Sequence, residues 1–179
     1  RVRLEIGGKS KQQLERELKR AKINTGKYTR RMLHSREFTT LDSSTIIDLV
    51  RFKSDGLGLR GMATRNEVWA RAAELGLELC PSEVGPYLRL KDKNLRIGES
   101  YLIGMERLYD RHGNVGVFSL YNYGIDLVLS IDWQNPRYNH GDYPWYVFAL
   151  PASTSLRTGK QNEPQNTKKL GLFDRIFKR

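Results

Sequence analysis

The sequence has little of what disulfide-bonded, zinc-binding and membrane-spanning proteins need. Its single cysteine, Cys80, excludes an intrachain disulfide and fits a reducing compartment. The three histidines, His34, His112 and His140, stand far apart and offer no zinc-ligand spacing, so we expect no metal and no other cofactor. The apolar runs are only a few residues long, whereas a membrane-spanning helix needs about 18 apolar residues.

The chain opens with Arg1-Val2-Arg3, without the apolar segment of a signal peptide. We therefore expect a cytoplasmic protein, with peripheral association at a membrane as the alternative. Hydrophobic residues make up 39% of the sequence and aromatic residues 10%, which is enough for a packed core and argues against a disordered chain. The length of 179 residues predicts one domain of about 150 residues with a tail.

Positive charge is concentrated at the two ends of the chain. Residues 1–40 hold twelve Lys/Arg against four Asp/Glu, residues 41–151 hold twelve against fourteen, and residues 152–179 hold seven against two. The formal net charge of +11 therefore comes from two basic ends on a near-neutral body. Basic blocks attract polyanions, so nucleic acid or an anionic membrane surface is the expected partner.

Three helices are predicted in the first half of the chain. Ser10 is a suitable N-cap for a helix over residues 10–22, and a second, short helix follows over residues 27–34. Thr64 and Glu67 form a capping box that starts a third helix, and Gly76 ends it.

Short apolar segments bounded by turn residues predict strands. These segments are residues 2–6, 46–53, 87–91, 100–109, 115–121, 127–132 and 145–150. Residues 110–114 suit a hairpin loop, and residues 80–86 read as an irregular loop because they contain two prolines and a glycine. The prediction is an α+β domain over residues 1–151, with an antiparallel β-meander of four to six strands and two or three helices packed on one face.

The composition changes after residue 151. Residues 152–167 are rich in small polar residues and proline and predict a linker, and residues 168–179 are basic and amphipathic. A helix there would place four apolar side chains on one face: Leu172, Phe173, Ile176 and Phe177. Such a face could lie in a membrane interface, dock on a partner protein or pack back on its own domain. The pentapeptide 169–173 resembles the bacterial sliding-clamp-binding peptide, with lysine in place of its first glutamine.

The basic helix pair is the leading candidate for function. We expect phosphate contacts from six of its side chains, namely Lys11, Lys19, Arg20, Lys27, Arg30 and Arg31. The layout also permits a helix-turn-helix with residues 27–34 as the reading helix, and the plain alternative is a solvated basic surface. Trp133, Arg137 and Tyr138 are candidate groups for stacking against bases.

Enzymatic chemistry has weaker support. A hydrolase site near residues 80–86 would need Cys80 or Glu83 beside a histidine or a second carboxylate. The triplet Gly8-Lys9-Ser10 lacks the first glycine of a phosphate-binding loop, so it reads as a turn and a helix cap. We expect a binding module rather than an enzyme.

The segment Glu-Leu-Gly-Leu-Glu-Leu-Cys-Pro-Ser-Glu-Val-Gly-Pro, residues 74–86, resembles a family of small bacterial proteins known as uncharacterised open reading frames, many from candidate-phylum bacteria. The similarity extends from about residue 7 to residue 148. The resemblance implies a bacterial cytosolic origin, and it implies no activity, cofactor or catalytic residue.

Overall fold

The structure is a computed structural model that describes residues 1–59, 63–133 and 144–152. Its strands are β1 (Val2–Ile6), β2 (Asn24–Thr25), β3 (Thr45–Phe52), β4 (Ser100–Ile103), β5 (Leu108–Tyr109), β6 (Val115–Asn122), β7 (Leu127–Trp133) and β8 (Trp145–Ala149). They form one sheet in the order β1-β3-β8-β4-β6-β7-β2, with β5 paired to β6 outside this path. The tail segment 168–179 lies outside the described residues.

The sheet differs from the predicted meander in size and in direction. It has eight strands rather than four to six, and it is mixed, because β2 runs parallel to β7 and β4 runs parallel to β8. The last strand, β8, does not extend a meander at the edge but lies between β3 and β4. Strand spacing along a sequence favours antiparallel neighbours and gives no sign of such an insertion.

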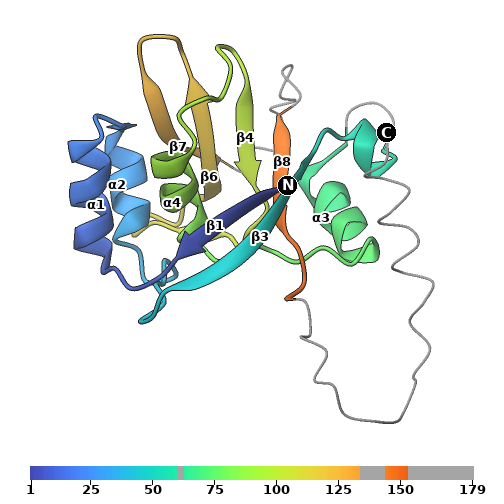
Figure 1. The fold of residues 1–179 in the computed structure, drawn as a ribbon, viewed down its shortest axis with the longest axis horizontal. Coiled ribbons are helices and arrows are strands. Elements are labelled where there is room, and N and C mark those ends of the chain that lie inside the picture. Colours follow the sequence, from blue (N-terminus) through green and yellow to red (C-terminus); the bar gives the residue numbers. More distant parts are fainter. Residues whose placement is uncertain (60–62, 134–143, 153–179) are drawn as a thin grey trace.

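In the described ranges, four helices accompany the sheet: α1 (Lys11–Arg20), α2 (Lys27–Leu33), α3 (Arg65–Glu74) and α4 (Val84–Lys91), with the short 3₁₀ helix η1 (Asp55–Leu57) before α3. The α+β class is confirmed, and α1, α2 and α4 lie together at one end of Figure 1 while α3 lies beside β8. The Trp69 ring of α3 packs 5.5 Å from that of Phe148, whereas the adjacent Val147 lines one cavity together with Leu88 of α4. Because successive strand residues face opposite sides, helices cover both faces, and the prediction of one covered face is wrong.

The predicted strand over residues 87–91 is part of helix α4. The end of the predicted loop over residues 80–86 also belongs to α4, because Gly85 and Pro86 lie in its first turn. Pro86 stands in the first turn, where its missing N–H removes no helical hydrogen bond. A side chain on Gly85 would place its Cβ 2.7 Å from Cβ of Phe118, so glycine lets α4 approach the sheet closely.

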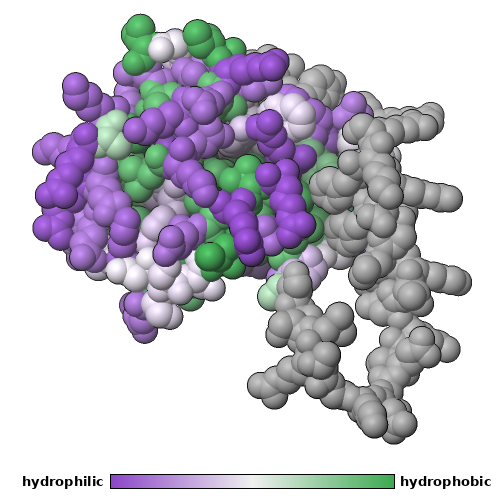
Figure 2. Space-filling view, in the orientation of Figure 1, coloured by the Kyte–Doolittle hydropathy of each residue, from purple (hydrophilic) through white to green (hydrophobic). Residues whose placement is uncertain are grey.

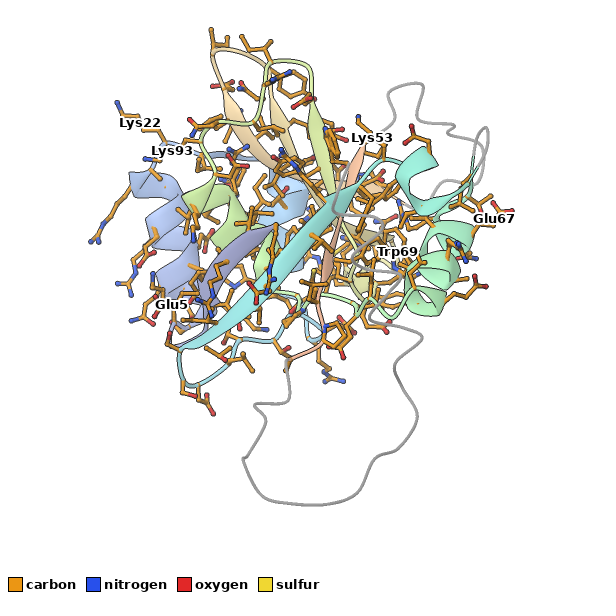
Figure 3. All side chains as sticks on the ribbon, turned by 45° about the vertical axis from the view of Figure 1, so that its right-hand side comes forward. Glu5, Lys22, Lys53, Glu67, Trp69 and Lys93 are labelled. Carbon is orange, nitrogen blue, oxygen red and sulfur yellow. The ribbon has the colours of Figure 1, made fainter. Side chains whose placement is uncertain are left out.

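The other predicted elements agree with the structure apart from local breaks. The segment 100–109 divides at Gly104 into β4 and β5, and the short connection between the first two predicted helices contains β2. Both helix caps form: Ser10 and Gln13 make a reciprocal capping box, as do Thr64 and Glu67. In Figure 3, Trp69 lies on the side of α3 that faces the sheet, and Glu67 lies on its outer side.

The packing of α1 and α2 fixes the basic end of the molecule. Leu14 and Leu18 of α1 are buried, as are Met32 and Leu33 of α2, so each helix presents its charged side to solvent. Within the described ranges, no helix is long and apolar enough to cross a bilayer.

Candidate nucleic-acid interface

Helices α1 and α2 are held as an antiparallel pair. Near the start of α1, Lys11 donates from Nζ to the carbonyl of Ser35, 2.8 Å away and just after α2. His34 Nε2 lies 2.9 Å from Glu15 Oε2 in the middle of α1. Thr29 is buried and donates its hydroxyl to the carbonyl of Leu129 in β7 at 3.1 Å. These contacts hold α2 against the sheet, so only its outer side is open to a ligand.

A cleft of about 710 Å³ lies between the outer side of α2, the segment that follows it, and the loop after β5. We call it the basic cleft, because five of its lining side chains are cationic: Lys27, Arg30, Arg31, Arg36 and Arg111. Its other lining residues are His34, Ser35, Glu37, Tyr109 and Asp110. Five cations and two carboxylates therefore line one concave surface, which gives it an excess of positive charge.

The five cations of the basic cleft have no carboxylate partner among the residues that the structure describes. Two cations outside the cleft are paired with carboxylates. Lys9 Nζ lies 2.6 Å from Glu17 Oε2, and Arg1 Nη2 lies 2.6 Å from Asp48 Oδ2. An anion entering the cleft therefore does not have to displace a protein carboxylate from these cations.

The carboxylate of Asp110 holds the loop that carries Arg111. It accepts hydrogen bonds from the backbone N–H groups of His112 and Asn114, at 2.8 and 3.0 Å, and from Nδ2 of Asn114 at 2.9 Å. These bonds, led by the one from the Asn114 side chain, hold the pKa of Asp110 below its ordinary value. Gly113 adopts a φ of 78°, which closes the turn without strain. The loop thus places Arg111 at the edge of the cleft.

One exposed tyrosine ring lines the basic cleft, and a second lies beside two of the cleft cations. Tyr109 lines it and is 46% exposed, and Tyr28 on α2 is 44% exposed. Lys27 Nζ lies 5.0 Å from the Tyr28 ring centroid, and Cζ of Arg31 lies 5.6 Å from it. Trp133 packs edge-on against Tyr28 with a centroid distance of 5.5 Å. Aromatic faces and cations therefore alternate along this surface.

The structure separates the six predicted phosphate contacts into two groups. Lys27, Arg30 and Arg31 line the basic cleft. Lys11 is bonded to a backbone carbonyl and lies 5.7 Å from the Phe38 ring, so it serves packing. The remaining two, Lys19 and Arg20, are exposed on the last turn of α1 and do not line the cleft. Figure 2 shows that hydrophilic side chains cover the α1 end of this face of the molecule.

The predicted stacking group is only partly described. Trp133 is half-buried and supports Tyr28 from the side, while Arg137 and Tyr138 lie outside the described residues. The four apolar residues of the tail, Leu172, Phe173, Ile176 and Phe177, also lie outside them, so docking through the tail stays a prediction.

Sequence reasoning missed three residues of the cleft: Arg36, Tyr109 and Arg111. Residues 110–114 were predicted as a hairpin loop, but no local signal places that loop beside a helix more than 70 residues earlier. A basic residue at the tip of a tight, polar loop was the one available hint.

The residues behind the hydrolase hypothesis are buried and bonded to backbone. Cys80 is 4% exposed, its Sγ lies 3.6 Å from the Val147 carbonyl oxygen, and burial raises the pKa of its thiol. Glu83 is fully buried, accepts a hydrogen bond from Leu41 N at 3.1 Å, and has a pKa raised by burial. In the described part of the chain, neither bonds to a histidine or a second carboxyl group, and no three potential metal ligands cluster. The hydrolase hypothesis gains no support from this geometry.

Comparisons with protein-family models, with curated proteins and with solved structures give no match to this chain. The resemblance of residues 74–86 to bacterial open reading frames therefore stays a hypothesis. The basic cleft is the feature of the molecule that points to a function.

Proposed function

We propose that this protein is a non-enzymatic nucleic-acid-binding module whose phosphate-binding surface is the basic cleft. One observation carries the proposal. Five Lys/Arg side chains from three separate segments face one concave surface, and within the described residues none of them is paired with a carboxylate.

The physical basis is the release of counterions from a phosphate backbone. Each cation that replaces a condensed counterion adds to the affinity and to its salt dependence. A cation already paired with a carboxylate gains less, because the existing pair must be given up first. Arginine also presents a planar fork that matches phosphate oxygens, and four of the five cleft cations are arginines.

The shape of the surface favours a polymer over a flat membrane. The basic cleft is concave, and cations from α2 and from the loop after β5 both line it, so an anion inside it is within reach of cations from two segments. A lipid headgroup layer would contact the rim of such a cleft and leave its inner cations poorly placed.

The test compares two double variants that remove equal charge. Arg30→Ala with Arg111→Ala takes one cation from each wall of the basic cleft, and Lys19→Ala with Arg20→Ala takes two from the exposed end of α1. We expect the cleft pair to weaken binding to a labelled oligonucleotide about tenfold or more and to lower the salt slope by about 2. Fluorescence anisotropy at several salt concentrations measures both quantities.

The α1 pair is the control, and its affinity should stay within about twofold of the parent protein. Circular dichroism and thermal melting check that both variants fold. Equal losses in the two pairs would place binding on general charge rather than in the cleft, and absence of binding by the parent protein would end the proposal.

A further inference from the structure

We infer that the basic cleft accepts single-stranded nucleic acid in preference to a duplex. This inference rests on the proposed function and adds the class of ligand to it. Two independent features carry it. One is the position of α2, and the other is a pair of exposed rings, Tyr109 lining the cleft and Tyr28 beside two of its cations.

Helix α2 forms one side of the basic cleft and is not positioned to read bases in the major groove of a duplex. A helix that reads duplex DNA projects from its domain and enters a major groove about 12 Å wide. The seven residues of α2 span only about 10 Å, and Thr29, Met32 and Leu33 on its inner side are buried. Its outer side faces the loop that carries Tyr109 and Arg111 across the cleft. A duplex docked along the outer side of α2 would have to pass this loop, so we expect the loop to disfavour duplex binding.

The size of the cleft agrees with a single strand. A volume of about 710 Å³ falls in the range of small-ligand sites, roughly 300–1,000 Å³. We therefore expect this open cleft to accommodate a few nucleotides of one strand.

The exposed tyrosine rings provide stacking surfaces for unpaired bases, which occur in single strands and not within a duplex. Unpaired bases have free faces that stack on aromatic side chains beside arginine, whereas duplex bases already stack on each other. Tyr109 stands directly before Asp110 and Arg111 in the cleft wall. Tyr28 lies between Lys27 and Arg31, both of which also line the cleft. A strand whose phosphates meet these cations can place bases on the two rings.

The experiment uses the full chain with a labelled single strand of about 12 nucleotides, in DNA and in RNA form, and with the matching duplex. The parent protein should bind one or both single strands about tenfold tighter than the duplex. Tyr28→Ala with Tyr109→Ala should weaken single-strand binding about five- to hundredfold, with the salt slope unchanged. Duplex binding by this variant should remain at the parent level.

A conservative control separates stacking from folding. Tyr28→Phe with Tyr109→Phe keeps both rings and should keep single-strand affinity. Preference for the duplex, or full single-strand affinity in the tyrosine-to-alanine variant, would overturn the inference while a loss in the Arg30/Arg111 variant would still support the proposed function. Unchanged binding in the Arg30/Arg111 variant would overturn both.

Discussion

Three cations near the start of the chain, Arg1, Lys9 and Lys11, differ from those of the basic cleft in what they contact. Lys9 and Arg1 lie 2.6 Å from carboxylates, and Lys11 donates to a backbone carbonyl. Arg30 and Arg111 line the cleft without a carboxylate partner in the described part of the chain. The two groups are alike in side-chain type, so the difference shows that charge counted along a chain is not the charge a ligand can use.

Among changes to residues other than the cleft cations, we expect Asp110→Ala to have the largest effect on oligonucleotide affinity. Asp110→Ala removes a negative charge from the cleft, which by itself would raise anion affinity. It also frees the loop that positions Arg111, because three hydrogen bonds to the carboxylate are lost. We expect positioning to dominate and affinity for the oligonucleotide to fall about tenfold. The same change at Asp126, in the turn between β6 and β7, is the matched control and should leave affinity unchanged, whereas a gain of affinity in Asp110→Ala would contradict this account.

The hydrogen bonds of Asp110 in this loop make the stability of the folded protein depend on pH. The folded pKa of Asp110 lies below the ordinary value of 3.8, so its contribution to stability is complete above that value. The contribution is lost as the pH falls through the folded pKa, because the carboxyl then binds a proton in both states. Urea unfolding should therefore show the parent protein more stable than Asp110→Ala at about pH 7, with the difference narrowing at about pH 3.

We expect a smaller effect on oligonucleotide affinity from neutralising one carboxylate inside the basic cleft or one outside it. Glu37→Gln removes a negative charge that lines the basic cleft, and Glu17→Gln releases Lys9 from its partner outside the cleft. The first change should raise oligonucleotide affinity about two- to fivefold, and the second should leave it unchanged. Both add the same charge, so equal gains in anisotropy titrations would show that only net charge matters.

The smallest effect on binding is expected at Lys11, which the sequence placed among the phosphate contacts. Lys11→Ala removes a hydrogen bond to Ser35 and a contact with the Phe38 ring. Urea unfolding should show a loss of about 1–2 kcal/mol of stability. Oligonucleotide affinity should not change once folding is complete, and a clear loss of affinity would return Lys11 to the binding surface.

Local signals predicted the parts of the fold that depend on local physics. The capping residues Ser10 and Thr64 start their helices, and alternation predicted the strand of residues 2–6. The pattern failed at Gly85 and Pro86, where close packing on Phe118 decides the residue types. It also could not place β8 in the middle of the sheet, because that pairing joins segments far apart in the chain.

The residues of the basic cleft likewise fall into a group that local sequence predicted and a group that it did not. Lys27, Arg30 and Arg31 were found from the basic helix, since they are neighbours in sequence. Tyr109 and Arg111 were missed, because only the pairing of β5 with β6 and the packing of α2 on β7 bring their loop to the helix. Tertiary pairing, rather than composition, turns a basic segment into a cleft.

The most direct measurement is ultraviolet crosslinking of a single strand that carries a photoreactive base, followed by peptide mapping. The account predicts crosslinks at Tyr109 and Tyr28 and in the segments around them, and predicts their loss in the Arg30/Arg111 variant. Crosslinks confined to α1, or crosslinks that persist in that variant, would contradict the claim that the basic cleft is the binding surface.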